Sequence, residues 1–332
     1  MINMNKFDGS CGERDSSLDT MKFFLVVGMI VAHALQILCR PMPGFISYFS
    51  TFINTITFSG FIYVFGQTTY YAYIRKPKEL VGKKMLKTAV KLLIGYYISA
   101  FSYRLLINHT INPLVYIRTF TLLDIAGYSE FLLSFALLIP VCYVLHEDLY
   151  QMKSRGHLIW GGVILLSTFI PYSFVNNTHL GLLIGTTAFY CFPVLQYFPI
   201  YLLGQSDARG FTSKVTNVLI ILLMSIALLY AIYQGKLPNR FPPSLGFILI
   251  GLGASRLYKA MASSIDSSLS SSILKELKRW GTNTLDLLVL SNISIFGLYD
   301  VFRVVGIDFS IFNSTLAIIV VLCICRIYLI LK

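Results

Sequence analysis

The chain has 332 residues, of which 56% are hydrophobic and 13% charged, and its mean hydropathy is +0.70. A soluble globular domain usually carries about a quarter charged residues, so this composition excludes an ordinary soluble protein. The formal net charge of +12 does not indicate nucleic-acid binding, because the basic residues cluster between apolar runs instead of covering one face of a folded domain. The partner that the composition indicates is a lipid bilayer.

Apolar segments long enough to cross a bilayer fill the chain almost from end to end. Crossing about 30 Å of hydrocarbon as a helix takes about 20 mostly apolar residues. We therefore predict an all-α, polytopic membrane bundle with about ten transmembrane helices, the sixth of them interrupted at Pro193 and Pro199. The predicted spans are Thr20–Leu38, Ile46–Tyr73, Met85–Ile107, Glu130–His146, Leu158–Tyr172, Leu180–Gly204, Val215–Gln234, Leu245–Lys259, Trp280–Tyr299 and Phe312–Leu331.

The remaining organisation is simple. Residues 1–19 are predicted to form a cytoplasmic N-terminal segment that is not a cleavable signal peptide, and residues 20–332 a single membrane domain. The serine-rich stretch Ser263–Ser272 is predicted to be a flexible cytoplasmic loop. The six cysteines are scattered without a C-x-x-C pair, so neither a metal site nor a disulfide framework is predicted.

The lysines and arginines predict the orientation in the membrane. With a cytoplasmic N-terminus, the cytoplasmic side collects most of them, including the run from Arg75 to Lys87. This bias predicts a multi-pass protein of the cell membrane, either a plasma or an inner membrane, with both termini on the cytoplasmic side. The opposite side keeps only Arg40, Arg104, Arg118, Lys236, Arg240 and Arg303.

The first predicted helix carries ionisable residues on one face. Asp19 and Lys22 lie at its cytoplasmic end, and His33 follows Lys22 by eleven residues, about three turns. Ionisable groups within a membrane are costly and normally face protein or a water-filled cavity. We expect this face, with Asp19, Lys22 and His33, to line the interior of the bundle.

The spacing suggests a chemical role. Lys22 and His33 are separated by about 16 Å along the axis, roughly the reach of an extended pantetheine arm. A coenzyme with its phosphates near Lys22 would present a thioester near His33, whose imidazole is a suitable general base. The alternatives are a histidine that hydrogen-bonds a neighbouring helix and an Asp19–Lys22 pair that only anchors the helix at the interface.

A second basic set lies at the start of the third predicted helix. Lys84, Lys87 and Lys91 follow an i, i+3, i+7 pattern and share one face. They are candidates for binding coenzyme phosphates as point charges. The alternative is a set of lysines that extend to the interface and enforce the cytoplasmic orientation.

Several segments, in order along the chain, match one family. Arg14, Asp19, Lys22 and His33 form R-x4-D-x2-K-x10-H, which is similar to the R-x4-D-x2-R-x10-H opening of the acyltransferase 3 family of membrane O-acyltransferases. Further segments resemble motifs of that family: F-S-G-F at 58–61, K-L-L-I-G-Y-Y at 91–97, Y-F-P-I-Y-L-L-G at 197–204, R-F-P-P-S at 240–244 and G-T-N-T-L at 281–285.

The resemblance implies a function. It implies an O-acyltransferase, with acetyl as the expected acyl group, that uses cytoplasmic acyl-CoA as donor and a surface or lipid-linked glycan as acceptor. His33 would be catalytic with Asp19 beside it, and Arg14, Lys22, Lys84, Lys87 and Lys91 would bind the coenzyme. The acceptor would be O-antigen, capsule or another envelope polysaccharide.

The chain also departs from the family. Lys22 replaces an arginine, the paired arginines of the third helix are represented by Lys84 with Lys87 or Lys87 with Lys91, and Ser291 occupies a position where histidine is frequent. Glu130-Phe131 replaces Trp-Phe.

Other polar residues within the predicted spans are candidates for an acceptor cavity or for helix packing: Asn54, Gln67, Thr68, Gln196, Asn283, Asp286 and Asn292.

Two points remain open from the sequence. A carboxylate inside a helix needs a partner, so Asp286 is predicted to pair with a basic residue at the cytoplasmic mouth. The alternative function is a glycan or lipid-linked-intermediate transporter or polymerase without acyl transfer, for which the typical paired, broken half-helices are not evident.

Overall fold

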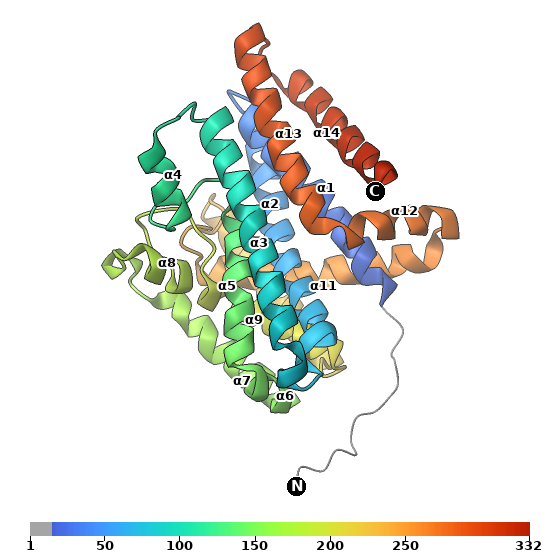
Figure 1. Cartoon of the computed structure of the whole chain (residues 1–332). Helices are drawn as coiled ribbons and strands as arrows, with labels where there is room; N and C mark the ends of the chain where they lie inside the picture. Colours follow the sequence, from blue (N-terminus) through green and yellow to red (C-terminus); the bar gives the residue numbers. More distant parts are fainter. Residues whose placement is uncertain (1–14) are drawn as a thin grey trace.

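The computed structural model describes residues 15–332, and every regular element in that range is helical (Figure 1). Fourteen α-helices are joined by short loops and three short π or 3₁₀ segments. In chain order they are α1 Ser16–Leu38, α2 Gly44–Thr69, η1 Tyr70–Ile74, α3 Lys78–Leu106, α4 Pro113–Phe120, α5 Glu130–Val144, α6 His146–Gln151, α7 Ser154–Leu165, η2 Leu166–Phe169, η3 Tyr172–Phe174, α8 Thr178–Ile184, α9 Val194–Ala208, α10 Lys214–Tyr233, α11 Leu245–Ser268, α12 Ser271–Thr282, α13 Thr284–Val305 and α14 Ile311–Leu331.

Helix α1 is the centre of the bundle. It packs against α2, α11, α12, α13 and α14, and most of its residues are buried. On the other side of α2 lies α9, while α3 packs on α5 and α13 (Figure 1). The residues that α1 carries are therefore enclosed by protein on several sides, as predicted for its ionisable face.

Six helices in the described part of the chain are long and apolar enough to cross a membrane. They are α1, α2 with η1, α10, α11, α13 and α14. Helix α10 has only 17% of its apolar window buried in the protein, and α14 only 28%. Apolar surface on that scale indicates contact with lipid, so the protein is a helical membrane protein.

The other predicted spans differ in form. Helix α3 is continuous but carries several lysines in its first half, and α5 ends at Val144 after 15 residues. The predicted span Leu158–Tyr172 is wrong as one helix, because α7 ends at Leu165 and continues only as a 3₁₀ turn. The predicted break in Leu180–Gly204 is confirmed at Pro193, where a non-helical segment between α8 and α9 ends, but not at Pro199, which lies inside α9.

The serine-rich stretch is not a flexible loop. Helix α11 continues to Ser268 and α12 begins at Ser271, so only two residues separate them. Serine hydroxyls within the stretch bond back to their own helix, as Ser264 does to the Ala260 carbonyl and Ser268 to the Ser264 carbonyl. This local bonding satisfies the serine hydroxyls within the helix. The helix therefore forms although the stretch lacks the apolar periodicity by which a helix is predicted from sequence.

A polar network joins the hairpin of α11 and α12 to the start of α1. Asp266 accepts hydrogen bonds from Ser16 and Thr20 and lies near Lys278. Asp15 caps α1 through the Ser17 amide and pairs with Lys259. Burial alone would raise the pKa of the Asp15 carboxyl, but hydrogen bonds from Lys259 and Ser17 hold that pKa below its ordinary value.

Two glycines bring α2 and α9 into backbone contact. A Cβ atom at Gly66 would lie 2.2 Å from the Tyr201 carbonyl oxygen, and one at Gly204 would lie 2.0 Å from the Tyr63 carbonyl oxygen. Small residues allow helices in membranes to approach this closely. Gly281 gives α12 a similar approach to α1, because its Cβ would lie 2.1 Å from the Asp19 carbonyl oxygen.

Candidate functional site

His33 lies deep in the bundle in a chain of hydrogen bonds. Its side chain is buried, and Nδ1 lies 2.9 Å from the Asn292 Oδ1 atom on α13. The Asn292 amide nitrogen donates to Ser99 Oγ on α3 at 2.9 Å and to the Tyr128 carbonyl oxygen at 3.0 Å. Ser99 Oγ in turn lies 2.6 Å from Ser129 Oγ. The imidazole of α1 is thus held by a chain of hydrogen bonds through α13, α3 and the loop before α5.

This chain of bonds sets the tautomer of His33. A backbone carbonyl can only accept a hydrogen bond, so the Asn292 nitrogen must face Tyr128 and its oxygen must face His33. The imidazole therefore carries its proton on Nδ1. Nε2 is left with its lone pair and forms no hydrogen bond with any residue between 15 and 332. A neutral imidazole in that state is a proton acceptor.

Tyr128 holds the imidazole from a second direction. Its ring meets the His33 ring edge to face, with centroids 5.1 Å apart. Its backbone has a φ of 64°, a left-handed conformation that costs a non-glycine residue roughly 1–2 kcal/mol. Such strain persists where surrounding contacts fix the residue, and here the Asn292 bond and the His33 ring do so.

His33 lines a cavity of about 290 Å³, termed the His33 cavity. The loops before α5, α9 and α11 cover it, and α1, α2 and α3 supply its walls. Aromatic rings from Tyr103, Tyr128, Phe131, Tyr190, Phe192 and Phe241 surround a smaller number of polar groups. An enclosed site with apolar walls and a few convergent polar groups is typical of a small-molecule binding site.

Two opposite charges face the same cavity. Glu130, the first residue of α5, is buried, and its Oε2 atom has no hydrogen-bond partner among residues 15–332. Arg240, from the loop before α11, lines the cavity, and its guanidinium lies over the Phe241 ring at 4.4 Å. Buried charged atoms are costly when unpaired. Glu130 and Arg240 are thus the acidic and the basic residue that line this cavity.

Lys22 lines a second cavity, of about 200 Å³, termed the Lys22 cavity. Thr68 at the end of α2 and Thr282 and Thr284 at the α12–α13 junction contribute its hydroxyl groups. Lys22 Nζ lies 3.4 Å from Asp19 Oδ1, and the Asp19 side chain is buried. The Asp19–Lys22 pair, which is the alternative interpretation of these two residues from the sequence, is therefore present, and it lies next to an open volume.

The two cavities lie along the same helix. The Lys22 cavity belongs to the end of the bundle where α1 begins and α2 ends, and the His33 cavity to the end where α1 and α3 finish. On α5 their walls are consecutive residues, since Phe131 faces the His33 cavity and Leu132 the Lys22 cavity. The adjacent side chains Phe131 and Leu132 thus form a layer of α5 that contacts both volumes.

The other predicted coenzyme residues lie elsewhere. Lys84, Lys87 and Lys91 are exposed on α3, and none of them lines the Lys22 cavity, although Leu92 does. Arg14 lies outside the described residues. The structure therefore brings Lys22 and His33 to cavities on one helix and places Asp19 beside Lys22, with the α3 lysines on the surface.

Some site residues were not assigned from the sequence. Asn292 was only one of several polar candidates, and Ser99 and Tyr128 were not considered, because their roles depend on contacts between helices distant in sequence. Arg240 had one signal, an arginine before Pro-Pro on the side that is poor in basic residues. The prediction for Asp286 is confirmed, since its carboxylate lies 2.6 Å from Lys332 Nζ and accepts from the Tyr328 hydroxyl.

Comparisons of the chain with protein-family models, with curated proteins and with solved structures find no match.

Proposed function

We propose that the protein is a membrane O-acyltransferase, in its simplest form an O-acetyltransferase, that moves an acyl group from cytoplasmic acyl-CoA to a hydroxyl of an envelope or exported polysaccharide. The observation that carries the proposal is the arrangement of α1. It presents Lys22 to one cavity and an imidazole with an unoccupied Nε2 to another, about three turns away. The order of motifs that resemble the acyltransferase 3 family gives independent support.

In this proposal the donor enters through the Lys22 cavity. Its phosphates remain near the basic cytoplasmic end, and the pantetheine arm extends along α1 toward the layer at Phe131 and Leu132. Lysine binds phosphate as a point charge, so Lys22 orients the coenzyme without a bidentate contact. Asp19 holds the Lys22 ammonium and acts as a positioning residue.

The acceptor hydroxyl enters through the His33 cavity. His33 Nε2 takes the hydroxyl proton as the oxygen attacks the thioester carbonyl. When the tetrahedral intermediate collapses, the carbon–sulfur bond breaks and the imidazolium returns the proton to the departing thiolate. Asn292 positions the ring through Nδ1 and stabilises the imidazolium by the same hydrogen bond.

The walls of the His33 cavity suit a sugar. The tyrosine and phenylalanine rings offer apolar faces for the C–H faces of a pyranose, and tyrosine adds hydroxyl groups. Glu130 and Arg240 supply an acceptor and a donor for sugar hydroxyls. We assign the acceptor-binding role to this aromatic and charged set.

Lys22 provides the direct test of donor binding. Replacing one charged partner of a phosphate typically removes about 1.5–3 kcal/mol, so Lys22→Gln and Lys22→Glu should weaken acyl-CoA binding by roughly 10–100-fold. Isothermal titration of acetyl-CoA into purified protein measures the change. Lys275→Glu, an exposed lysine of α12 outside the cavity, is the matched control. Equal affinity in wild type and both Lys22 variants would remove Lys22 from the donor site.

The proposal includes a ten-span topology with both termini in the cytoplasm, in which α3, α5 and the broken segments α7 and α8–α9 also lie within the membrane. Cysteine labelling from either side of the membrane should find Ser154→Cys and Ser268→Cys cytoplasmic and Asn176→Cys external. The asymmetry of lysine and arginine motivates this expectation. Labelling of positions 176 and 268 from the same side would contradict it.

A further inference from the structure

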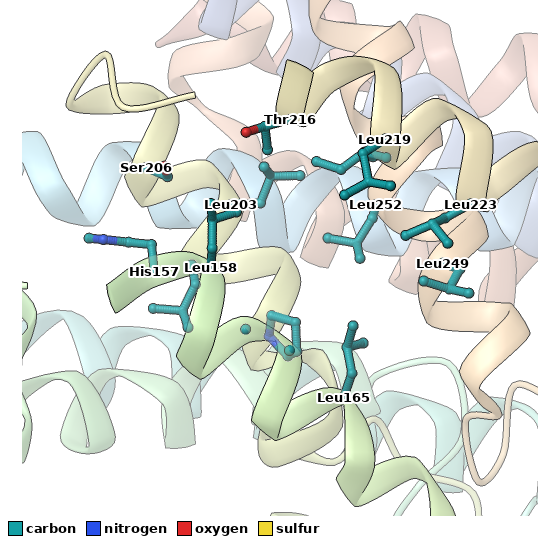
Figure 2. Close-up of a pocket in the computed structure, with 15 residues that line it drawn as sticks. His157, Leu158, Leu165, Leu203, Ser206, Thr216, Leu219, Leu223, Leu249 and Leu252 are labelled. Atoms are coloured by element: carbon teal, nitrogen blue, oxygen red, sulfur yellow. The ribbon is translucent and has the colours of Figure 1, made fainter. Parts of the chain in front are cut away.

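A third cavity, distant from His33 and Lys22, lies between two helix pairs. Helix α7 packs on α9 and α10 packs on α11, and the space between the pairs has a volume of about 210 Å³. Figure 2 shows leucines from all four helices turned into this space, among them Leu165, Leu203, Leu223 and Leu252. We term it the α7–α10 cavity.

The cavity is open on the side of α7. Gly161 and Gly162 both line it, and a Cβ atom at either position would meet no atom within 4 Å. The adjoining face of α10 is mostly unburied and apolar. In a membrane this opening faces hydrocarbon, so the molecules that reach it from the bilayer are lipids.

The cavity has one polar end. His157, Ser206 and Thr216 line it toward one end, and Leu165, Leu223 and Leu249 lie toward the other (Figure 2). These residues belong to the start of α7, the end of α9 and the start of α10. Tyr71, in η1 directly after α2, donates a hydrogen bond to the Ala208 carbonyl, so this polar end lies at the same end of the bundle as the Lys22 cavity.

Basic side chains surround the polar end. Lys153 and Arg155 flank the start of α7, Lys214 begins α10, and all three are exposed. The nearby Arg209 is already bound to the carbonyls of Leu149, Tyr150 and Met152. The nearby carboxylate of Asp207 is paired with Arg256. Lys153, Arg155 and Lys214 therefore lie within four positions of the lining residues His157 or Thr216, and the exposed Glu147 and Asp148 of α6 precede them in the chain.

We infer that the α7–α10 cavity binds one acyl chain of an anionic glycerophospholipid from the cytoplasmic leaflet, with its phosphate at Lys153, Arg155 and Lys214. The leucine-lined part of the cavity accepts the acyl chain of the lipid, and the polar end of the cavity accepts its ester region. A cation near a membrane surface typically favours an anionic headgroup by about fivefold. The inference is independent of the proposed acyl transfer.

Native mass spectrometry of the full chain tests it. Detergent-solubilised protein is incubated with equimolar phosphatidylglycerol and phosphatidylethanolamine, and the bound lipid is identified after delipidation to the last retained molecule. We expect one retained phospholipid, with phosphatidylglycerol favoured at least fivefold. The double variant Gly161→Leu, Gly162→Leu fills the cavity with side chains and should lose it.

Val163→Phe is the matched control, because it adds bulk to an exposed position of the same helix that does not line the cavity, and it should retain the lipid. Replacing Lys153, Arg155 and Lys214 by glutamine should abolish the preference for phosphatidylglycerol, while the acyl chain of a phospholipid still binds in the cavity. A monodisperse size-exclusion profile establishes that each variant is folded. The inference would be overturned if the wild type retained no phospholipid or if the Gly161→Leu, Gly162→Leu variant still retained one. It would also be overturned if the retained molecule were an isoprenoid lipid.

Discussion

His33→Gln should reduce glycan acylation by about 10²–10⁴-fold, the usual contribution of a positioned general base. The physical reason is the fixed tautomer of His33. Its Nδ1–H is bound to Asn292, which leaves the Nε2 lone pair as the proton acceptor of the proposed mechanism. Glutamine keeps approximate size and hydrogen bonding but cannot shuttle the proton. The variant should still insert into membranes and still bind acetyl-CoA.

The measurement is the amount of acyl ester formed on the glycan at equal membrane abundance of each protein. His179→Gln is the control, because His179 is exposed and bonds only the Thr121 carbonyl through Nε2 among the described residues, and its activity should equal that of wild type. Acylation by His33→Gln within about threefold of wild type, a small fraction of the usual general-base contribution, would show that His33 is not the base.

Gly204→Ala should cause a large loss of stability for the addition of a single methyl group. The added Cβ would lie 2.0 Å from the Tyr63 carbonyl oxygen, and a backbone atom inside a helix cannot turn away as a flexible side chain does. Overpacking typically costs 1–3 kcal/mol, and with backbone on both sides we expect about 3 kcal/mol. The apparent Tm of the purified protein should fall by about 5 °C or more.

Gly297→Ala is the matched control for this change. Gly297 is also inside a helix, but a Cβ there meets no atom within 4 Å. Alanine is more favourable than glycine inside a helix by about 1 kcal/mol, so this variant should be as stable as wild type or more stable. Equal melting temperatures for Gly204→Ala and Gly297→Ala would mean that α2 and α9 do not approach as closely as the structure has them.

The sequence predicted the architecture well where hydropathy alone decides it. The membrane class, the all-helical fold and the helices around His33 and Asp286 follow from apolar runs of sufficient length. It failed where an apolar segment does not form one long helix. The segments that became α7, η2, α8 and α9 are largely apolar, yet they form short or broken helices. Helix α9 is mostly buried, whereas α7 buries only His157, so hydropathy does not determine where these helices end.

The candidate site was predictable in part. One helical face with Asp19, Lys22 and His33 follows from the period of the helix, and the structure places cavities at both ends of that face. The hydrogen bonds from Asn292 to Ser99 and Tyr128 join segments separated by more than 160 positions in the chain. No local pattern encodes such contacts, and a single sequence therefore does not identify the residue that orients His33.

The central claim is best tested on the product. Surface polysaccharide from the source organism, with the gene deleted and then restored, is analysed by NMR for O-acyl esters before and after mild base treatment. The account predicts that one base-labile ester signal is lost on deletion and returns with the wild-type gene but not with His33→Gln. An unchanged set of ester signals in the deletion strain would contradict it.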